Sequence, residues 1–109
     1  MKQWEIWLYP FEKERPHPVV IISNDERAER AENVNGLLCV TLRGDQTLRA
    51  HEVLLNNADG LEWETACRCD YFYALPKANF RGNRRGLVSK ERRRAIAGKI
   101  NEILRLANP

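Results

Sequence analysis

The sequence predicts a mainly β fold in which five or six short strands form a small barrel or half-barrel, followed by one C-terminal helix. Two patterns carry this prediction. Short apolar segments rich in aromatic and β-branched residues recur through the first 76 residues, with turn-forming residues between them. The C-terminal segment instead repeats apolar side chains at helical spacing. The 109 residues are about one domain's length, so we expect a single domain over residues 1–109.

The first two predicted strands are residues 5–11 and 18–23. Residues 5–11, EIWLYPF, have the aromatic and β-branched content of a strand. Residues 18–23, PVVIIS, are apolar and β-branched nearly throughout, which is typical of a strand buried on both faces. Residues 24–33 open with two helix-capping residues and continue with helix formers, so a short surface helix or a long loop is expected there.

Three further strands are expected before the basic segment. Residues 36–42 and 51–55 are short apolar runs, and an Asp-Gly pair favours a tight turn after the second of them. Residues 64–76 form a longer run of strand formers that either bends partway or divides into two strands. Residues 80–86, FRGNRRG, have the composition of a loop.

The C-terminal helix is predicted to begin after the capping residue Ser89 and to end near Ala107. Its apolar stripe follows the i, i+4, i+7, i+8 pattern and consists of Ile96, Ile100, Ile103, Leu104 and Ala107. Gly98 interrupts the helix at a cost of about 1 kcal/mol relative to Ala. That cost is tolerable if the helix backbone lies close against a strand at this position.

Charge is divided unevenly along the chain. Residues 1–76 have 8 basic and 13 acidic side chains, a net charge of −5, whereas residues 77–109 have 10 basic and 2 acidic ones, a net charge of +8. This polarity indicates a polyanion or an acidic peptide as partner. The alternative is a solvated helix face preceded by a basic loop.

The cysteine content and the absence of long apolar runs indicate a reducing compartment. Three cysteines cannot all pair within one chain, and no secretory signal or membrane-spanning run of about 18 apolar residues is recognisable. We therefore expect a cytoplasmic protein with free thiols that does not associate with membranes. A zinc site usually needs four ligands in paired short spacings, which the chain lacks, so no metal or other cofactor is expected.

The segment TACRCD (65–70) places two pairs of residues on opposite faces of a strand. Cys67 and Cys69 share one face, and Arg68 and Asp70 share the other. Cysteine is among the most buried residue types, so the cysteines are predicted to be the core pair. Arg68 and Asp70 are then exposed about 6–7 Å apart at their base, which suits a cation and a proton acceptor around one phosphate. The alternative is a surface ion pair worth at most about 1 kcal/mol.

Five segments resemble, in order, the MazF/PemK (Kid-like) family of bacterial toxins. EIWLYPF (5–11) is similar to the family's first strand, and HPVVIISND (17–25) is similar to its Arg-Pro-Val-Val-Ile-Ser strand. LLCVTLRG (37–44) resembles its third strand, which ends in a threonine. TACRCDYFYALPKANF (65–80) resembles the strand that the Kid branch writes as Val-Arg-Cys-Asp-Gln, and LVSKERRRAIAGKINEILRL (87–106) resembles its terminal helix.

The resemblance implies an SH3-like barrel with a C-terminal helix, the fold shared by the MazF and CcdB toxins. It implies a homodimeric toxin of a type II toxin-antitoxin system, whose cognate antitoxin lays an acidic tail over the RNA site. It also implies a sequence-specific endoribonuclease that cleaves single-stranded messenger RNA without metal and leaves a 2′,3′-cyclic phosphate.

Position by position, the resemblance implies four catalytic residues. Arg68 and Asp70 fall on the proposed acid/base pair of the Kid branch, and Thr41 falls on the family's active-site threonine. His17 stands where the family has the arginine of its Arg-Pro motif, and Arg15 precedes it by two residues. We expect Asp70 or His17 to act as base, His17 to be the candidate acid, Arg68 to stabilise charge and Thr41 to bind the phosphate. The alternatives are a spacer role for His17 and a strand-edge position without a role for Thr41.

Further RNA contacts are predicted from the side chains of Arg15, Arg43, His51, Lys77 and Arg81, with His51 at the rim rather than in catalysis. Specificity is expected to depend on loops around residues 24–34, 43–50 and 77–86. The three tryptophans, Trp4, Trp7 and Trp63, could stack on bases. Trp7 is better explained as a core residue.

Two functions from other classes remain open at the level of sequence. The same barrel resembles CcdB-type toxins, which poison DNA gyrase without catalysis. A small adaptor barrel could instead bind acidic peptides through residues 77–99. Of the three functions, only the nuclease requires Arg68 and Asp70.

Overall fold

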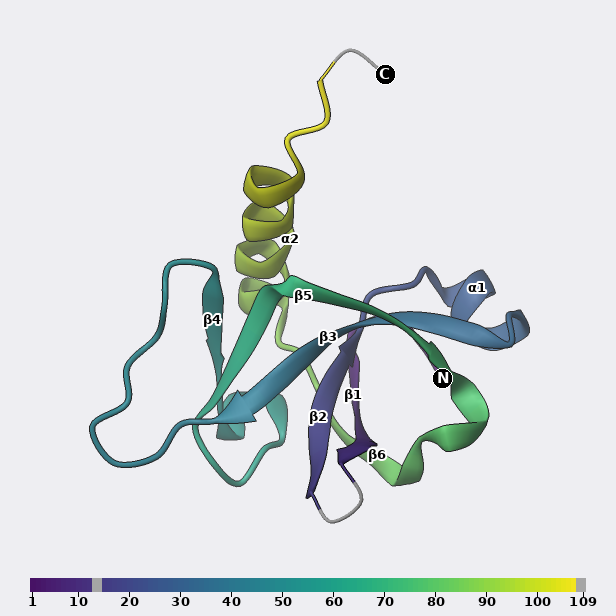
Figure 1. Ribbon diagram of the computed structural model, residues 1–109, viewed down its shortest axis with the longest axis horizontal. Helices are drawn as coiled ribbons and strands as arrows, with labels where there is room; N and C mark the ends of the chain where they lie inside the picture. The colour runs from purple at the N-terminus through teal and green to yellow at the C-terminus, as the bar shows by residue number, and fades with distance from the viewer. Residues whose placement is uncertain (13–14, 108–109) are drawn as a thin grey trace.

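The computed structural model describes residues 1–12 and 15–107, and it shows a curled six-stranded sheet with a long helix on one side (Figure 1). All pairs of neighbouring strands are antiparallel, in the order β4-β5-β3-β2-β1-β6. The strands are β1 Glu5–Glu12, β2 Arg15–Ile21, β3 Asn33–Thr41, β4 Glu52–Leu55, β5 Thr65–Pro76 and β6 Arg81–Leu87. The helices are α1 Asp25–Arg30 and α2 Lys90–Leu104, with 3₁₀ turns η1 Asn57–Asp59 and η2 Lys77–Asn79. The predicted fold class, a half-barrel with a C-terminal helix, is confirmed.

The expected loop at residues 80–86 is wrong, because these residues form β6 at the edge of the sheet. β6 pairs with β1 through Ile6 opposite Gly86 and Leu8 opposite Arg81. An edge strand with one pairing partner can be polar and glycine-rich, so its composition resembles a loop. Gly86 is required at its position, because a Cβ there would lie 2.2 Å from the carbonyl oxygen of Asp59.

β5 is one continuous strand that bends, which selects one of the two expectations for residues 64–76. Cys67 lies opposite Cys39 and Phe72 lies opposite Leu37, so residues 68–71 of β5 face the single residue Leu38 of β3. Such an insertion is a bulge, and bulges bend strands and redirect side chains. Arg68 and Asp70 both lie in this bulge.

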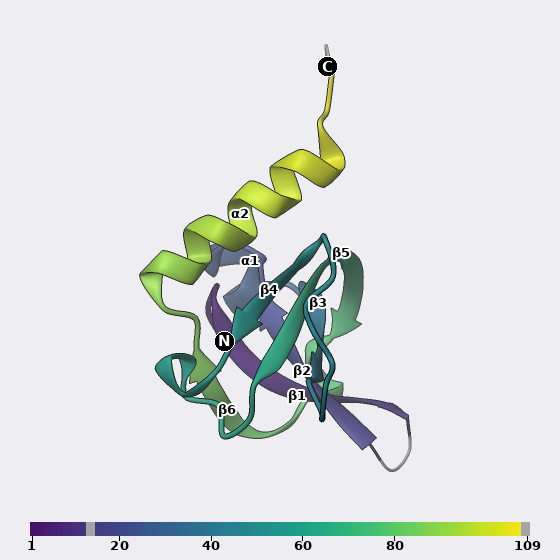
Figure 2. The ribbon, with the colours of Figure 1, turned by 90° about the vertical axis from the view of Figure 1, so that its left-hand side faces the viewer.

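The main core lies between the concave face of the sheet and α2, which packs on β4 and β5 (Figure 2). Cys67 and Cys69 are fully buried in it, as predicted, and their thiols and that of Cys39 are free. Contact with the Cys39 and Cys69 thiols, together with burial, raises the pKa of Cys67 well above its usual value. A second cluster beneath α1 joins Val19, Ile21, Ala28, Val34 and Leu75.

Two expectations about α2 are corrected. The helix ends at Leu104 rather than near Ala107, because Arg105 takes a left-handed conformation with φ 34° and ends the helix. Leu104 is 48% exposed, whereas Ile96 is buried and Ile100 and Ile103 pack on the core. Gly98 does not lie close against a strand, since a Cβ at this position would meet nothing within 4 Å.

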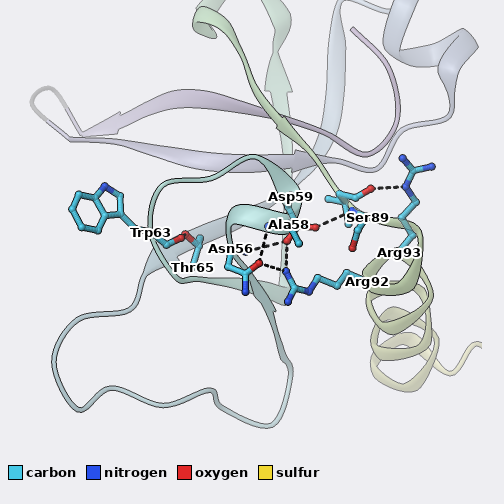
Figure 3. A network of polar contacts seen from close by, with 9 residues as sticks. Asn56, Ala58, Asp59, Trp63, Thr65, Ser89, Arg92 and Arg93 are labelled. Carbon is cyan, nitrogen blue, oxygen red and sulfur yellow. Dashed lines mark hydrogen bonds and ion pairs between the residues drawn. The ribbon is translucent and has the colours of Figure 1, made fainter.

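A buried carboxylate fixes the start of α2 against η1 (Figure 3). Asp59 accepts hydrogen bonds from the backbone N–H groups of Ser89 (2.8 Å) and Asn56 (3.0 Å) and forms an ion pair with Arg92. Burial alone would raise the pKa of Asp59, but these two hydrogen bonds and the Arg92 guanidinium outweigh it and hold the pKa below its ordinary value. The Asp59 carboxylate therefore links the loop of residues 56–64 to the first turn of α2 through hydrogen bonds and an ion pair.

No helix in the described part of the chain is long and apolar enough to cross a membrane.

Candidate functional site

Arg68 and Asp70, the two residues that the nuclease hypothesis requires, line one pocket of about 220 Å³. We call it the Arg68 pocket, and its lining residues are Arg49, Ala50, His51, Glu52, Arg68, Asp70 and Tyr71. The bulge in β5 supplies Arg68, Asp70 and Tyr71, the start of β4 supplies Glu52, and the segment just before β4 supplies the others. A cation, a carboxylate and an imidazole therefore converge on one small concavity.

Arg68 is held in place by Glu52 and Tyr71, not by Asp70. Its Nε lies 3.3 Å from Oε2 of Glu52, directly across the β4–β5 pair, and its guanidinium lies over the Tyr71 ring at 5.0 Å from the centroid. The Glu52 side chain is 6% exposed, and its Oε1 accepts a hydrogen bond of 2.7 Å from the backbone N–H of Arg49. Glu52 thus forms an ion pair with a partly buried guanidinium whose Nε makes no hydrogen bond to a described residue, and the Arg68 side chain remains 24% exposed.

Asp70 lies free at the mouth of this pocket. It is exposed, and no cation of the described chain lies within ion-pair distance of it. The surface ion pair between Arg68 and Asp70, the alternative considered from the sequence, is therefore not formed. Asp70 is available to accept a proton or a hydrogen bond from a ligand.

His17, Thr41, Arg15 and Arg43 line a different pocket of about 530 Å³, which we call the His17 pocket. β2 begins at Arg15, so Arg15 and His17 are two residues apart on one strand and both reach this pocket. The His17 ring lies 6.1 Å from the Phe11 ring, centroid to centroid. Thr41 is the last residue of β3 and is half-buried.

The four predicted catalytic residues therefore do not share one pocket. Strand β3 lies between β2, which carries His17, and β5, which carries Arg68. Two strand spacings separate their backbones by about 10 Å. A third depression of about 320 Å³, lined in part by residues of the 43–50 loop, lies between them and shares Val40 with the His17 pocket and Arg49, Glu52 and Arg68 with the Arg68 pocket.

His51, predicted to lie at the rim of the RNA site, is exposed and lies beside Arg68 and Asp70. It lines the Arg68 pocket itself, and its carbonyl oxygen accepts a hydrogen bond of 2.9 Å from the backbone N–H of Cys69. That bond ties the start of β4 to the bulge that carries Arg68 and Asp70. Of the chain's two histidines, His51 is the one that shares their pocket.

Two of the predicted RNA-binding residues lie outside these pockets. Lys77 donates from Nζ to the carbonyl oxygens of Ala28 (2.7 Å) and Glu29 (2.8 Å), so its ammonium binds the C-terminal end of α1. Arg81 is exposed on β6 and lines neither the Arg68 nor the His17 pocket.

The tryptophans divide clearly between core and surface. Trp4 packs on the main core, and Trp7 packs on the second cluster and donates from Nε1 to Glu5 at 3.1 Å. The core position predicted for Trp7 is confirmed. Trp63 is 67% exposed, so it alone of the three presents its ring to solvent.

Glu52 is the site residue that sequence reasoning missed. The signal was present, because Glu52 and Leu54 alternate with Val53 and Leu55 and so leave a carboxylate on the outer face of β4. Its pairing with Arg68 depends on the register of β4 against β5, which cannot be determined from the sequence. No group of three or more His, Cys, Asp or Glu side chains in residues 1–12 and 15–107 is arranged to hold a metal ion.

Comparison with known proteins gives one family and one fold. The model of the PemK-like, MazF-like toxins of type II toxin-antitoxin systems matches residues 2–104. The fold is similar to an endoribonuclease in complex with its cognate antitoxin from mycobacterial species, with a TM-score of 0.80 and 20% identity over 100% of this chain and 99% of that chain.

Two further solved structures agree. Mycobacterium tuberculosis toxin MazF-mt6 has a TM-score of 0.76 and 20% identity over 95% of this chain and 99% of that one. A MazE-MazF structure from Deinococcus radiodurans has a TM-score of 0.78 and 13% identity over 98% and 97% of the two chains. At these identities the likeness establishes the fold. No curated protein matches the chain.

Proposed function

The chain belongs to the PemK-like, MazF-like toxins of type II toxin-antitoxin systems, and we propose that it acts in such a system as an endoribonuclease that cleaves single-stranded RNA without a metal ion. The observation that carries the proposal is the Arg68 pocket, where Arg68, Asp70 and His51 meet. A cation held by an ion pair, a carboxylate without an ion-pair partner among the described residues, and an imidazole are the groups that such a cleavage needs.

The proposed reaction begins at the 2′-hydroxyl of the nucleotide bound in the Arg68 pocket. Asp70 takes the proton of this hydroxyl, and the 2′ oxygen attacks the adjacent phosphorus. The bond from phosphorus to the 5′ oxygen of the next nucleotide then breaks, and an imidazolium gives its proton to that oxygen. The products are a 2′,3′-cyclic phosphate and a free 5′-hydroxyl.

Arg68 stabilises the negative charge that develops on the phosphorane. A guanidinium does not give up its proton at neutral pH, so Arg68 is not the acid. Its anchoring by Glu52 and Tyr71 fixes the cation before substrate binds, which makes charge stabilisation effective without reorganisation. Thr41 and the cations of the His17 pocket contact the RNA strand beside the cleaved bond.

His51 is our first candidate for the acid and His17 the second, because His51 shares the pocket of Arg68 and Asp70. An unperturbed imidazole titrates near pH 6.5 and suits proton transfer at neutral pH. The pH–rate profiles of His51→Ala and His17→Ala separate the two candidates. The variant that lacks the acid loses the fall in rate at high pH, and the other variant keeps it.

We also propose that the protein forms a homodimer and is inhibited by an antitoxin with an acidic segment. Two similar structures are described as complexes, one with a cognate antitoxin and one of MazE with MazF. The net charge of +8 over residues 77–109 suits an acidic partner. Light scattering at micromolar concentration checks the dimer, and a strictly monomeric mass counts against it.

The direct test of the proposed function is incubation of the purified protein with a long RNA, with and without EDTA. The expected result is cleavage in both samples, with 2′,3′-cyclic phosphate at the new ends. Growth arrest on expression without cleavage of any RNA would contradict the nuclease and would favour a toxin that acts by binding gyrase.

A further inference from the structure

The pockets beside the His17 pocket continue across the surface to the start of α2. Next to it lies the Trp63 pocket of about 300 Å³, which shares Pro18 and Thr41 with the His17 pocket. Beyond that lies the Arg93 pocket of about 570 Å³, which shares Gly60 and Arg85 with the Trp63 pocket. The three pockets are therefore neighbours in series, each joined to the next by two shared lining residues.

Trp63 stands in the middle of this series on a well-fixed loop. Its carbonyl oxygen accepts a hydrogen bond of 2.9 Å from the Thr65 hydroxyl, and Asn56 and Asp59 cap each other reciprocally at the other end of the loop. The indole projects away from the Asp59–Arg92 network (Figure 3), and it is the most exposed aromatic side chain of the described chain. A rigid loop that holds an indole in solvent is typical of a surface that binds a flat apolar group.

The Arg93 pocket is strongly cationic. Its lining includes Arg84, Arg85, Lys90 and Arg93. Its single acidic side chain is Asp59, whose carboxylate is fully buried and bound to Arg92, Ser89 and Asn56.

Two of these four cations are occupied within the protein, and two are not. Arg84 lies 3.6 Å from Glu5, and Arg93 donates from Nε to the carbonyl oxygen of Val88. Arg85 and Lys90 have no carboxylate of the described residues within ion-pair distance. The pocket thus presents uncompensated positive charge to an anion.

From these observations we propose that the Trp63 and Arg93 pockets form an extended subsite for single-stranded RNA. One base stacks on the Trp63 indole, and a phosphate farther along the same strand binds Arg85 and Lys90. Single-stranded RNA alternates flat bases with anionic phosphates, so an exposed aromatic ring beside cations can bind both parts of it. The inference rests on the proposed function, because it takes the strand to continue from the cleavage site.

RNA fits this subsite better than an acidic peptide does. Glu62 and Glu64 flank Trp63, and both are exposed. These carboxylates repel the anionic groups of either ligand, but each nucleotide also brings a flat base that stacks on the indole, which the aspartate and glutamate side chains of a peptide tail lack. Phosphates farther along the RNA strand reach the cations of the Arg93 pocket, which adjoins the Trp63 pocket at Arg85.

The test uses fluorescence anisotropy with an oligonucleotide that carries 2′-O-methyl groups, which binds but cannot be cleaved. Trp63→Ala should weaken binding about 5- to 150-fold, and Trp63→Phe, which keeps an aromatic face, should lose much less. Arg85→Gln should weaken binding and reduce the slope of log affinity against log salt by about 0.7, the value for one phosphate contact of a single strand. Trp63→Ala should leave that slope unchanged. Lys2→Gln, at an exposed cation that lines none of these pockets, is the control for loss of a positive charge.

The outcomes distinguish failure of this subsite from failure of the proposed nuclease activity. Wild-type affinity in both Trp63→Ala and Arg85→Gln, while the wild type cleaves RNA, would overturn the subsite and leave the function standing. Weakened binding in both variants without any cleavage would support the subsite and remove the function. Competition by polyglutamate that depends on Arg85 but not on Trp63 would show a site for anions in general, and would also overturn the proposal.

Discussion

Removing the charge of Asp59 should strongly destabilise the fold, because this carboxylate joins η1 to α2. In Asp59→Asn the amide has one acceptor oxygen instead of two. A single oxygen cannot replace both carboxylate oxygens, of which one accepts a hydrogen bond from Ser89 and the other accepts from Asn56 and pairs with Arg92. Loss of one partner of a buried ion pair costs about 3–5 kcal/mol, and an orphaned buried N–H costs about 1–3 kcal/mol.

The Arg92 side chain is 23% exposed, so solvent recovers part of the first cost. We expect a loss of about 3 kcal/mol in the free energy of unfolding, measured by urea denaturation at pH 7. Asp25→Asn is the matched control, because exposed Asp25 accepts a single backbone hydrogen bond, from Gln3. It should change the free energy of unfolding by no more than about 0.5 kcal/mol.

The pH dependence tests the same reasoning. The lowered pKa of Asp59 in the folded state means that its contribution is fully present above the unfolded pKa of about 3.9 and is lost as the pH falls through the folded value. The difference in stability between wild type and Asp59→Asn should therefore shrink in acid. Equal stability of the two proteins at pH 7 would refute this account of how α2 is anchored.

Three further predictions concern packing, thiol reactivity and the positioning of Arg68. Gly86→Ala should lower the free energy of unfolding by about 1–3 kcal/mol, because the new Cβ would clash with the Asp59 carbonyl oxygen. Gly98→Ala should raise the free energy of unfolding by up to about 1 kcal/mol, because a Cβ at this position meets nothing and Ala favours the helix. Urea denaturation measures both changes, and a more stable Gly86→Ala with a less stable Gly98→Ala would contradict the packing. The buried Cys39, Cys67 and Cys69 thiols should resist a thiol reagent at neutral pH and react after unfolding in urea, and rapid labelling of the native protein would contradict their burial. Glu52→Gln should slow RNA cleavage by up to about 10²-fold, because releasing the Arg68 guanidinium misplaces the cation beside the reacting phosphate. Its pH–rate profile should keep its shape, since Glu52 positions Arg68 and exchanges no proton with substrate; full activity would exclude that role.

The sequence was sufficient for the features that depend on local pattern. Alternation in TACRCD placed Cys67 and Cys69 in the core, because a cysteine and an arginine differ so strongly in their cost of burial. The strands at residues 5–11, 18–23 and 36–42 and the helix after Ser89 follow from residue composition and periodicity, and each is present with shifted ends. Ser89 occupies the N-cap position as predicted, but its side chain makes no capping hydrogen bond.

Features that depend on partners far along the chain were not predictable in this way. β6 reads as a loop because its polar residues gain their strand conformation from pairing with β1. The pairing of Arg68 with Glu52 depends on the register of β4 against β5, and the two residues are far apart in sequence. The separation of His17 from Arg68 follows from the strand order, which places β3 between them.

The most direct test of the central claim is the single-turnover cleavage rate of Arg68→Ala and Asp70→Ala on one long RNA in the presence of EDTA. The Arg68 pocket as a cleavage centre predicts that both variants remain folded, Arg68→Ala with reduced stability because buried Glu52 loses its partner, and that both cleave about 10²–10⁴-fold more slowly. Lys2→Ala, which removes an exposed cation outside the pockets, should cleave at the wild-type rate. Folded Arg68→Ala and Asp70→Ala proteins that cleave as fast as the wild type would contradict the claim that this pocket performs the chemistry.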